Sequence, residues 1–140
     1  MESCLSLKTR PAKNKQLSEH FNELELCCKK HWRVPVGGMD AKLIEFLEKL
    51  RLELGVPLHI HSGYRCPEWN KAVGGVSSSF HIKAMAADIS SRNLSPKQIG
   101  AKAEAMFGIQ IGLGVYTKKK SFVHIDSGNG VKGKKRRWTG

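Results

Sequence analysis

Two short clusters of histidine and aspartate constrain the fold of this chain more than any other feature. His81 and Asp88 lie in the first cluster, and His124 lies in the second, about forty residues later. Two imidazoles and one carboxylate form the ligand set of a zinc site that keeps a fourth position open for water. Asp88 follows His81 by seven positions, a spacing that suits neither a helix turn nor a single strand. A loop must therefore fold His81 back onto Asp88 while a second segment delivers His124.

Two segments have the pattern of amphipathic helices. Between residues 41 and 54, apolar residues recur at three- and four-residue intervals, with Asp40 before them as a cap and Gly55 after them as a stop. Ser95 and Pro96 begin a second helix that runs to about residue 107. The apolar stripe of the first helix is expected to face the core.

Four segments are predicted as strands, at residues 57–61, 86–90, 109–116 and 121–126, the last two forming a hairpin with a very basic tip. The glycine-rich piece 112–114 lacks the following helix that a nucleotide-binding loop needs, so we interpret it as a strand with close backbone approach. Because the hairpin strands are grouped and the helices lie elsewhere, we expect an α+β fold: a small antiparallel sheet with helices packed against it.

Length and charge limit the domain organisation and the partners. A chain of 140 residues is long enough for one core. We expect residues 1–15 to form a basic flexible arm and residues 16–140 to form a single domain with a basic C-terminal tail. Lys and Arg total 24 against 12 acidic residues, a formal net charge of +12 with histidine neutral. The expected partner is anionic, and nucleic acid, anionic lipid and an anionic bacterial envelope all fit.

Motifs for specific nucleic-acid binding do not accompany this charge. The sequence has no zinc-finger spacing, helix-turn-helix signature or aromatic ribonucleoprotein motif, which disfavours that function. It also has no apolar run long enough to cross a bilayer, and its first residues lack the apolar stretch of a secretory signal. We therefore expect synthesis in the cytoplasm without a signal peptide. For a target outside the membrane, either another component would have to release the protein or a precursor's leader is missing from this sequence.

The four cysteines are too few and too irregularly spaced for the disulfide framework of a small secreted domain. Cys27 and Cys28, with His31 nearby, suggest metal binding. No matching second pair follows, however, and Cys4 and Cys66 are isolated. We therefore expect buried thiols rather than a zinc finger.

An ordered series of motifs links the chain to a known family. They are Ser62-Gly63-Tyr64-Arg65, Asn70-x-x-Val73-Gly74-Gly75, Ser79-x-His81-x-x-Ala84-x-Ala86-x-Asp88 and Val123-His124-Ile125-Asp126. Over roughly residues 17 to 138 the chain resembles the zinc D-alanyl-D-alanine carboxypeptidase family, which includes phage endolysins that cleave L-alanyl-D-glutamate bonds and which shares a fold with the hedgehog signalling domain.

The resemblance implies roles for four residues. His81, Asp88 and His124 would be the zinc ligands. Arg65 matches the arginine that binds the substrate carbonyl or carboxylate in the family. A guanidinium suits this task because it donates two parallel hydrogen bonds and keeps its charge.

The chain departs from the family pattern at two places. Ala84 replaces a usual glycine, a modest change if φ is negative there and a strained one otherwise. Ser121 and Phe122 occupy the positions where family members keep the general base. Asp126 is the substitute on the same strand face as His124, either as the base or as a residue that orients this ligand. His61 is a third candidate for the base.

The sequence thus predicts a zinc-dependent peptidase that hydrolyses peptidoglycan stem peptides at a bond involving a D-amino acid, as a carboxypeptidase or an endopeptidase. Arg65 and Asp126 are the expected catalytic residues, with Ser79 and Tyr116 as substrate contacts. The protein would be a monomer whose basic surface is attracted to anionic cell-wall polymers. It would act at the bacterial cell wall once released, as a phage or prophage lysis enzyme or a wall-remodelling protein.

Two other hypotheses remain open at this stage. The first is a catalytically inactive, zinc-containing module that binds the cell wall, which the missing base position favours. The second is a basic nucleic-acid binder whose histidines are structural.

Overall fold

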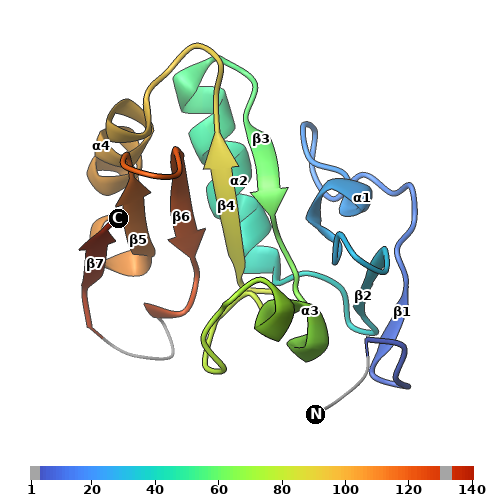
Figure 1. The fold of residues 1–140 in the computed structure, drawn as a ribbon. Coiled ribbons are helices and arrows are strands. Elements are labelled where there is room, and N and C mark those ends of the chain that lie inside the picture. Colours follow the sequence, from blue (N-terminus) through green and yellow to red (C-terminus); the bar gives the residue numbers. More distant parts are fainter. Residues whose placement is uncertain (1–3, 130–133) are drawn as a thin grey trace.

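The computed structural model describes residues 4–129 and 134–140 of the chain (Figure 1). The described strands are β1 (Thr9–Pro11), β2 (Arg33–Pro35), β3 (His59–Ser62), β4 (Ala86–Ser90), β5 (Gly112–Tyr116), β6 (Phe122–Asp126) and β7 (Arg136–Thr139). The described helices are α1 (Glu23–Leu26), α2 (Ala41–Leu54), α3 (Pro67–Ala72), α4 (Pro96–Phe107) and the short 3-10 helix η1 (Gly108–Gln110). The expected α+β class is confirmed.

Both predicted helices form, with the predicted caps. The Asp40 side chain accepts a hydrogen bond from the backbone N–H of Leu43, and α2 ends at Gly55 in a left-handed conformation with φ of 69°. Ser95 and Gln98 cap α4 reciprocally. The apolar stripe of α2 is buried, and its Phe46 ring packs 4.8 Å from the ring of Phe107 on α4.

The described strands form two sheets. Strands β1 and β2 pair antiparallel, and the larger sheet has the order β3-β4-β6-β5-β7. This sheet is antiparallel from β3 to β5, and β7 joins β5 in parallel. In Figure 1, β1, β2 and α1 lie beside the β3 edge, at the opposite side from β7.

The two faces of the larger sheet differ in character. Ile89, Val123 and Ile125 are fully buried in the hydrophobic core with α2 and α4, which lie behind the sheet in Figure 1. Because side chains alternate along a strand, Asp88 and His124 project from the other face. The core therefore leaves one polar face available for a site.

The N-terminal segment differs from the expected flexible arm. Strand β1 pairs with β2, Cys4 is fully buried, and Arg10 forms two hydrogen bonds of 2.7 and 2.9 Å with the buried carboxylate of Glu23. Arg10 is therefore paired with a carboxylate, although the sequence predicted that the basic residues of this segment would be exposed to solvent. Residues 1–3 of the predicted arm lie outside the described residues.

The basic C-terminal segment also differs from the expected tail. Arg136–Thr139 forms β7, and Arg137 reaches Glu104 of α4 at 2.7 Å and the carbonyl oxygen of Gly108 at 2.6 Å. The charge of Arg137 is therefore paired within the fold. Residues 130–133 of the predicted tail lie outside the described residues. None of the helices in the described part of the chain is both long and apolar enough to span a membrane.

Candidate metal centre and substrate pocket

The register of the larger sheet sets two predicted metal ligands side by side. Asp88 of β4 is the direct partner of His124 on β6, and Gly114 and Trp138 continue this row on β5 and β7. Directly opposed residues project to the same face of a sheet. A Cβ atom at Gly114 would collide with the indole of Trp138, so glycine here lets the indole lie across β5 toward His124.

The turn before β4 delivers the third predicted ligand. His81 is 2% exposed, and its ring Nδ1 lies 2.7 Å from the carbonyl oxygen of Gly63. Its own carbonyl accepts a hydrogen bond of 3.0 Å from the backbone N–H of Arg65. These two contacts tie the turn to the loop after β3 and direct Nε2 of His81 toward Asp88.

Together, His81, Asp88 and His124 form what we call the His–Asp centre. Asp88 Oδ1 lies 3.2 Å from His81 Nε2 and 3.1 Å from His124 Nδ1, and the three ligand atoms lie within 4.8 Å of one another. The remaining ring nitrogens face Gly63 O at 2.7 Å and Asp126 Oδ2 at 2.8 Å. Such outer acceptors fix the tautomer that presents a lone pair to a metal, so the donor set fits zinc.

The electrostatics of the centre depend on these contacts. Burial alone would raise the pKa of Asp88, but hydrogen bonds from His124 and His81 hold the pKa well below its usual range. For His124, burial opposes the charged ring, yet its contacts with Asp126 and Asp88 raise the pKa above its ordinary value. Asp88 is therefore ionised, as a metal ligand must be.

Arg65 lies at the edge of the His–Asp centre in a fixed orientation. Its Nη2 donates to Asp88 Oδ2 at 3.2 Å, its Nη1 to Asn70 Oδ1 at 3.1 Å and its Nε to Ser62 Oγ at 3.0 Å. These contacts use one N–H on each nitrogen, which leaves a second N–H on each Nη for another acceptor. The sequence-predicted substrate arginine is thus adjacent to the predicted metal ligands.

A pocket of about 490 Å³ lies in front of the centre, and Arg65, Ser79 and Tyr116 all contribute to its lining. Aromatic rings form one wall: Tyr116 stacks on Phe122 with centroids 4.4 Å apart, and its hydroxyl accepts a hydrogen bond from Trp138 Nε1 at 2.7 Å. The Ser79 hydroxyl accepts a hydrogen bond from the backbone N–H of His81 at 3.2 Å.

Asp126 contacts His124 but is not one of the three residues whose ligand atoms converge. It is fully buried; its Oδ2 contacts His124 Nε2, and its Oδ1 accepts hydrogen bonds from Gly128 N and from Arg136. Asp126 therefore contacts the ring nitrogen of His124 that does not face Asp88. Burial would raise the pKa of Asp126, but the bonds from His124 and Arg136 lower it.

The other candidate bases are further from a catalytic position. His61 is exposed, bonds Ser90 Oγ at 2.6 Å and does not line the pocket. Among the described residues that do line it, Asp88 and Asp126 are the carboxylates. Ser121 and Phe122 supply no carboxylate or imidazole at the usual base positions.

Sequence reasoning missed two residues that complete this face. Arg136 bonds Asp126 and lies 4.8 Å from the Phe80 ring, and Trp138 packs 5.0 Å from the His124 ring. Both come from β7, in the segment expected to be a tail. Their spacing of two residues, which places both on one strand face, was the available signal.

Comparison with protein families decides the classification of this chain. The model of the Peptidase M15 family matches residues 19–126, which include His81, Asp88 and His124. The chain belongs to the peptidase M15 family. No curated protein matches it.

Membership supports a metallopeptidase, since M15 peptidases are generally zinc-dependent, and the His–Asp centre supplies a candidate site for the metal. The match ends at β6, so the Arg136 and Trp138 contacts from β7 are features of this M15 peptidase outside the matched segment.

Proposed function

We propose that this M15 peptidase is a zinc enzyme that hydrolyses peptidoglycan stem peptides at a bond next to a D-amino acid. The observation that carries the proposal is the His–Asp centre at the floor of a pocket that also contains Arg65. Three protein ligands suit a catalytic zinc site, because a closed structural site uses four. The M15 match and the resemblance to wall peptidases support the substrate class.

In this proposal, His81, Asp88 and His124 hold Zn²⁺, which when bound would polarise the scissile carbonyl and activate a water molecule. Arg65 binds a carboxylate or carbonyl of the stem peptide through the two N–H groups that Asp88, Asn70 and Ser62 leave available. The aromatic wall containing Tyr116 excludes water from one side of the peptide.

Asp126 acts as a positioning residue in this proposal. Asp126 lines the pocket, but its Oδ2 is engaged by His124 and its Oδ1 by Arg136 and Gly128 N. A buried carboxylate in this arrangement orients the imidazole and raises its basicity as a ligand. The geometry thus supports the orienting role for Asp126 over the role of general base.

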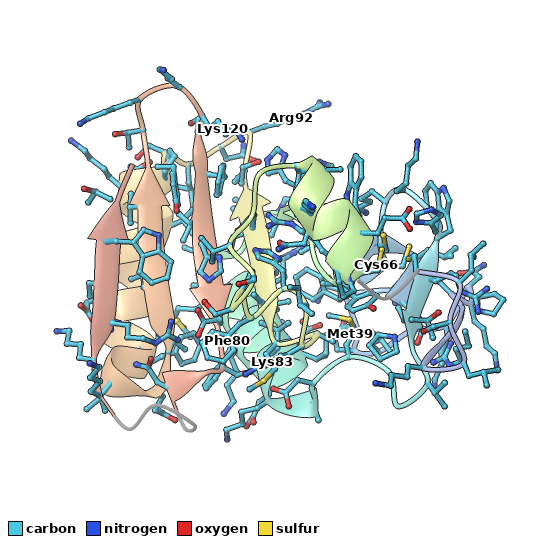
Figure 2. The ribbon with its side chains drawn as sticks, turned by 60° about the horizontal axis from the view of Figure 1, so that its bottom comes forward. Met39, Cys66, Phe80, Lys83, Arg92 and Lys120 are labelled. Carbon is cyan, nitrogen blue, oxygen red and sulfur yellow. The ribbon has the colours of Figure 1, made fainter. Side chains whose placement is uncertain are left out.

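The basic hairpin tip would help binding to an anionic wall. Lys120 lines the pocket, and Figure 2 shows it at the tip of the β5–β6 hairpin. Lys118 and Lys119 precede it and are also exposed. Positive charge beside the pocket raises the local concentration of an anionic polymer without fixing which bond is cut.

The test is digestion of isolated peptidoglycan by the purified protein, with zinc and after chelation, and identification of the fragments by mass. We expect zinc-dependent release of peptides cut next to a D-amino acid, lost in His81→Ala and retained in His59→Ala, an exposed histidine outside the pocket. Cleavage that survives complete removal of zinc would sink the proposal. One bound zinc without cleavage of any stem peptide would favour the inactive wall-binding module.

A further inference from the structure

A second group of potential metal ligands lies away from the pocket. Cys4, Cys28, His31 and Cys66 each present one ligand atom, and these four atoms lie within 4.8 Å of one another. The three cysteines are fully buried free thiols. We propose that these four residues, which we call the Cys–His centre, bind a structural zinc ion. This site is independent of the peptidase activity proposed above.

Two of the distances between ligand atoms fit tetrahedral coordination, and the others lie within 4.8 Å. With Zn–S bonds of about 2.3 Å, two sulfurs on one zinc lie about 3.8 Å apart, and a sulfur and a ring nitrogen about 3.6 Å apart. Cys28 Sγ and Cys66 Sγ are separated by 3.7 Å, and Cys66 Sγ lies 3.9 Å from His31 Nδ1. Three thiolates and one imidazole form a Cys₃His set, one of the ligand sets of closed structural zinc sites.

A tight loop presents two of the ligands. The backbone N–H of Cys28 donates to Arg33 O at 2.9 Å, and the N–H of Trp32 donates to Cys28 O at 2.7 Å. Trp32 takes a left-handed conformation with φ of 55°, which is uncommon for a non-glycine residue. This loop between α1 and β2 turns His31 back toward the sulfur of Cys66.

The outer contacts are those that support a metal site. The backbone N–H groups of Lys30, His31 and Cys66 are directed at the sulfur of Cys28. The backbone N–H of Trp69 points to Cys66 in the same way. On the far edge of the imidazole, His31 Nε2 lies 3.5 Å from Glu68 Oε1. Such contacts stabilise thiolates and orient a ligating histidine.

The site would join three parts of the fold. Cys4 precedes β1, Cys28 and His31 lie in the loop before β2, and Cys66 is the N-cap residue of α3, directly after Arg65. Figure 2 shows Cys66 between α3 and the side of the molecule that carries β1 and β2. A metal ion here would fasten the β1–β2 sheet to the loop that carries the substrate arginine.

A disulfide is the competing explanation for Cys28 and Cys66. A disulfide needs a bond of about 2.05 Å and joins only two sulfurs. It would leave Cys4 and His31 without a reason to converge on the same point. The four-ligand cluster therefore favours a metal over a disulfide.

The experiment counts metal and identifies its ligands in the full chain. We expect wild type purified with zinc to contain two zinc ions per chain, and His81→Ala/His124→Ala to keep one. Replacing the remaining metal with Co²⁺ in this double variant should give a sulfur-to-cobalt charge-transfer band, which nitrogen and oxygen ligands do not produce. Cys66→Ser in the same background should lose both the band and the ion.

Cys27→Ser provides the matched control, because Cys27 is the adjacent buried cysteine but its Sγ contacts Leu24 O at 3.3 Å and a serine hydroxyl can replace that contact. This variant should keep the band. A double histidine variant that binds no metal, a cobalt spectrum without the sulfur band, or a native mass showing a Cys28–Cys66 disulfide would each overturn the proposal. Because the band is read without substrate, failure of the peptidase proposal leaves this result unaffected.

Discussion

The His–Asp centre and the Cys–His centre are built in opposite ways. The first uses three ligands from the β-sheet and its adjoining turn and faces a pocket of about 490 Å³. The second uses four ligands from loops and a helix N-terminus, with its three sulfurs fully buried. An open site with three protein ligands leaves room for chemistry, whereas a closed site with four contributes folding energy.

Each centre nevertheless relies on the same kind of outer contact. Asp126 holds the second nitrogen of His124 at 2.8 Å, and Glu68 lies 3.5 Å from the second nitrogen of His31. The first carboxylate is fully buried, while the side chain of Glu68 is 51% exposed. The difference indicates that orientation is more strictly enforced in the centre that faces the pocket.

The largest effect should come from graded removal of metal. A chelator that strips only the three-ligand centre should reduce peptide hydrolysis by at least about 10³-fold, since the metal supplies several kcal/mol to catalysis. One zinc per chain and the thermal unfolding midpoint should remain. The measurement is zinc content, activity and unfolding at each chelator concentration. Loss of both ions at the same concentration would contradict the contrast between the centres.

The next effect concerns stability. Cys28→Ser should lower the free energy of unfolding by roughly 3–5 kcal/mol, because binding energy at a structural zinc site is folding energy. Denaturant unfolding measures the change, with Cys27→Ser expected to cost no more than about 1 kcal/mol. Equal losses for the two neighbouring cysteines would mean that packing, rather than metal binding, explains the effect.

A pH experiment distinguishes the contribution of the Arg10–Glu23 ion pair to stability from that of metal binding in the N-terminal region. The hydrogen bond from Arg10 lowers the pKa of Glu23, which is 1% exposed. This contribution is complete above the unfolded-state pKa and is lost as pH falls through the lower folded-state pKa. Glu23→Gln should cost about 2 kcal/mol at neutral pH, with a smaller cost in acid.

Unfolding free energies measured from about pH 3 to pH 7 test this sign. Glu53→Gln is the matched control, because Glu53 pairs with Lys102 at 3.7 Å and its side chain is 56% exposed. It should change stability by less than about 1 kcal/mol. If Glu23→Gln lowers the free energy of unfolding by the same amount at every pH, the Arg10–Glu23 ion pair does not contribute to stability.

Asp126→Asn sharpens the assignment within the His–Asp centre. If Asp126 orients His124, zinc affinity should fall about 10- to 100-fold, while turnover at saturating zinc stays near that of wild type. If Asp126 is the general base, zinc affinity should persist and turnover should be lost. Zinc dissociation constants and kcat at saturating zinc, measured on the same preparation, distinguish the two roles.

Local patterns predicted the elements that surround both centres. The stripe of α2, the caps of α4 and the hairpin of β5 and β6 were readable because capping and periodicity act over a few residues. The convergence of His81, Asp88 and His124 was expected through the motif series and is seen in the geometry.

Long-range features were harder to predict. Strands β1 and β7 contain basic residues, and their carboxylate partners Glu23, Glu104 and Asp126 make those charges structural. The Cys–His centre draws its ligands from positions 4, 28, 31 and 66, so just one pair has the spacing of a metal motif. Spacing identifies ligands that are adjacent in sequence, and it says little about ligands that tertiary contacts assemble.

The smallest effect concerns backbone strain, which both centres contain. Ala84, three residues after His81, has φ of 59°, and Trp32, directly after His31, has φ of 55°. Of the two alternatives stated for Ala84 in place of glycine, the strained one is therefore observed. A left-handed conformation costs an L-residue about 1–2 kcal/mol, and glycine removes most of that cost. Ala84→Gly and Trp32→Gly should each stabilise the fold by up to about 1 kcal/mol. Ala101→Gly on the exposed face of α4 should destabilise it by a similar amount.

Denaturant unfolding of the three glycine variants would measure these signs. If strain alone determines the outcome, Ala84→Gly and Trp32→Gly should both raise the free energy of unfolding, whereas Ala101→Gly should lower it. Destabilisation by Ala84→Gly would instead mean that the buried methyl group, 2% exposed in the smaller hydrophobic cluster with Cys28 and Cys66, contributes more by packing than it costs in strain. The sign of the stability change in Ala84→Gly therefore shows which effect is larger in the turn that follows His81. Stabilisation means that backbone strain outweighs packing, and destabilisation means that packing of the methyl group beside the Cys–His centre outweighs strain.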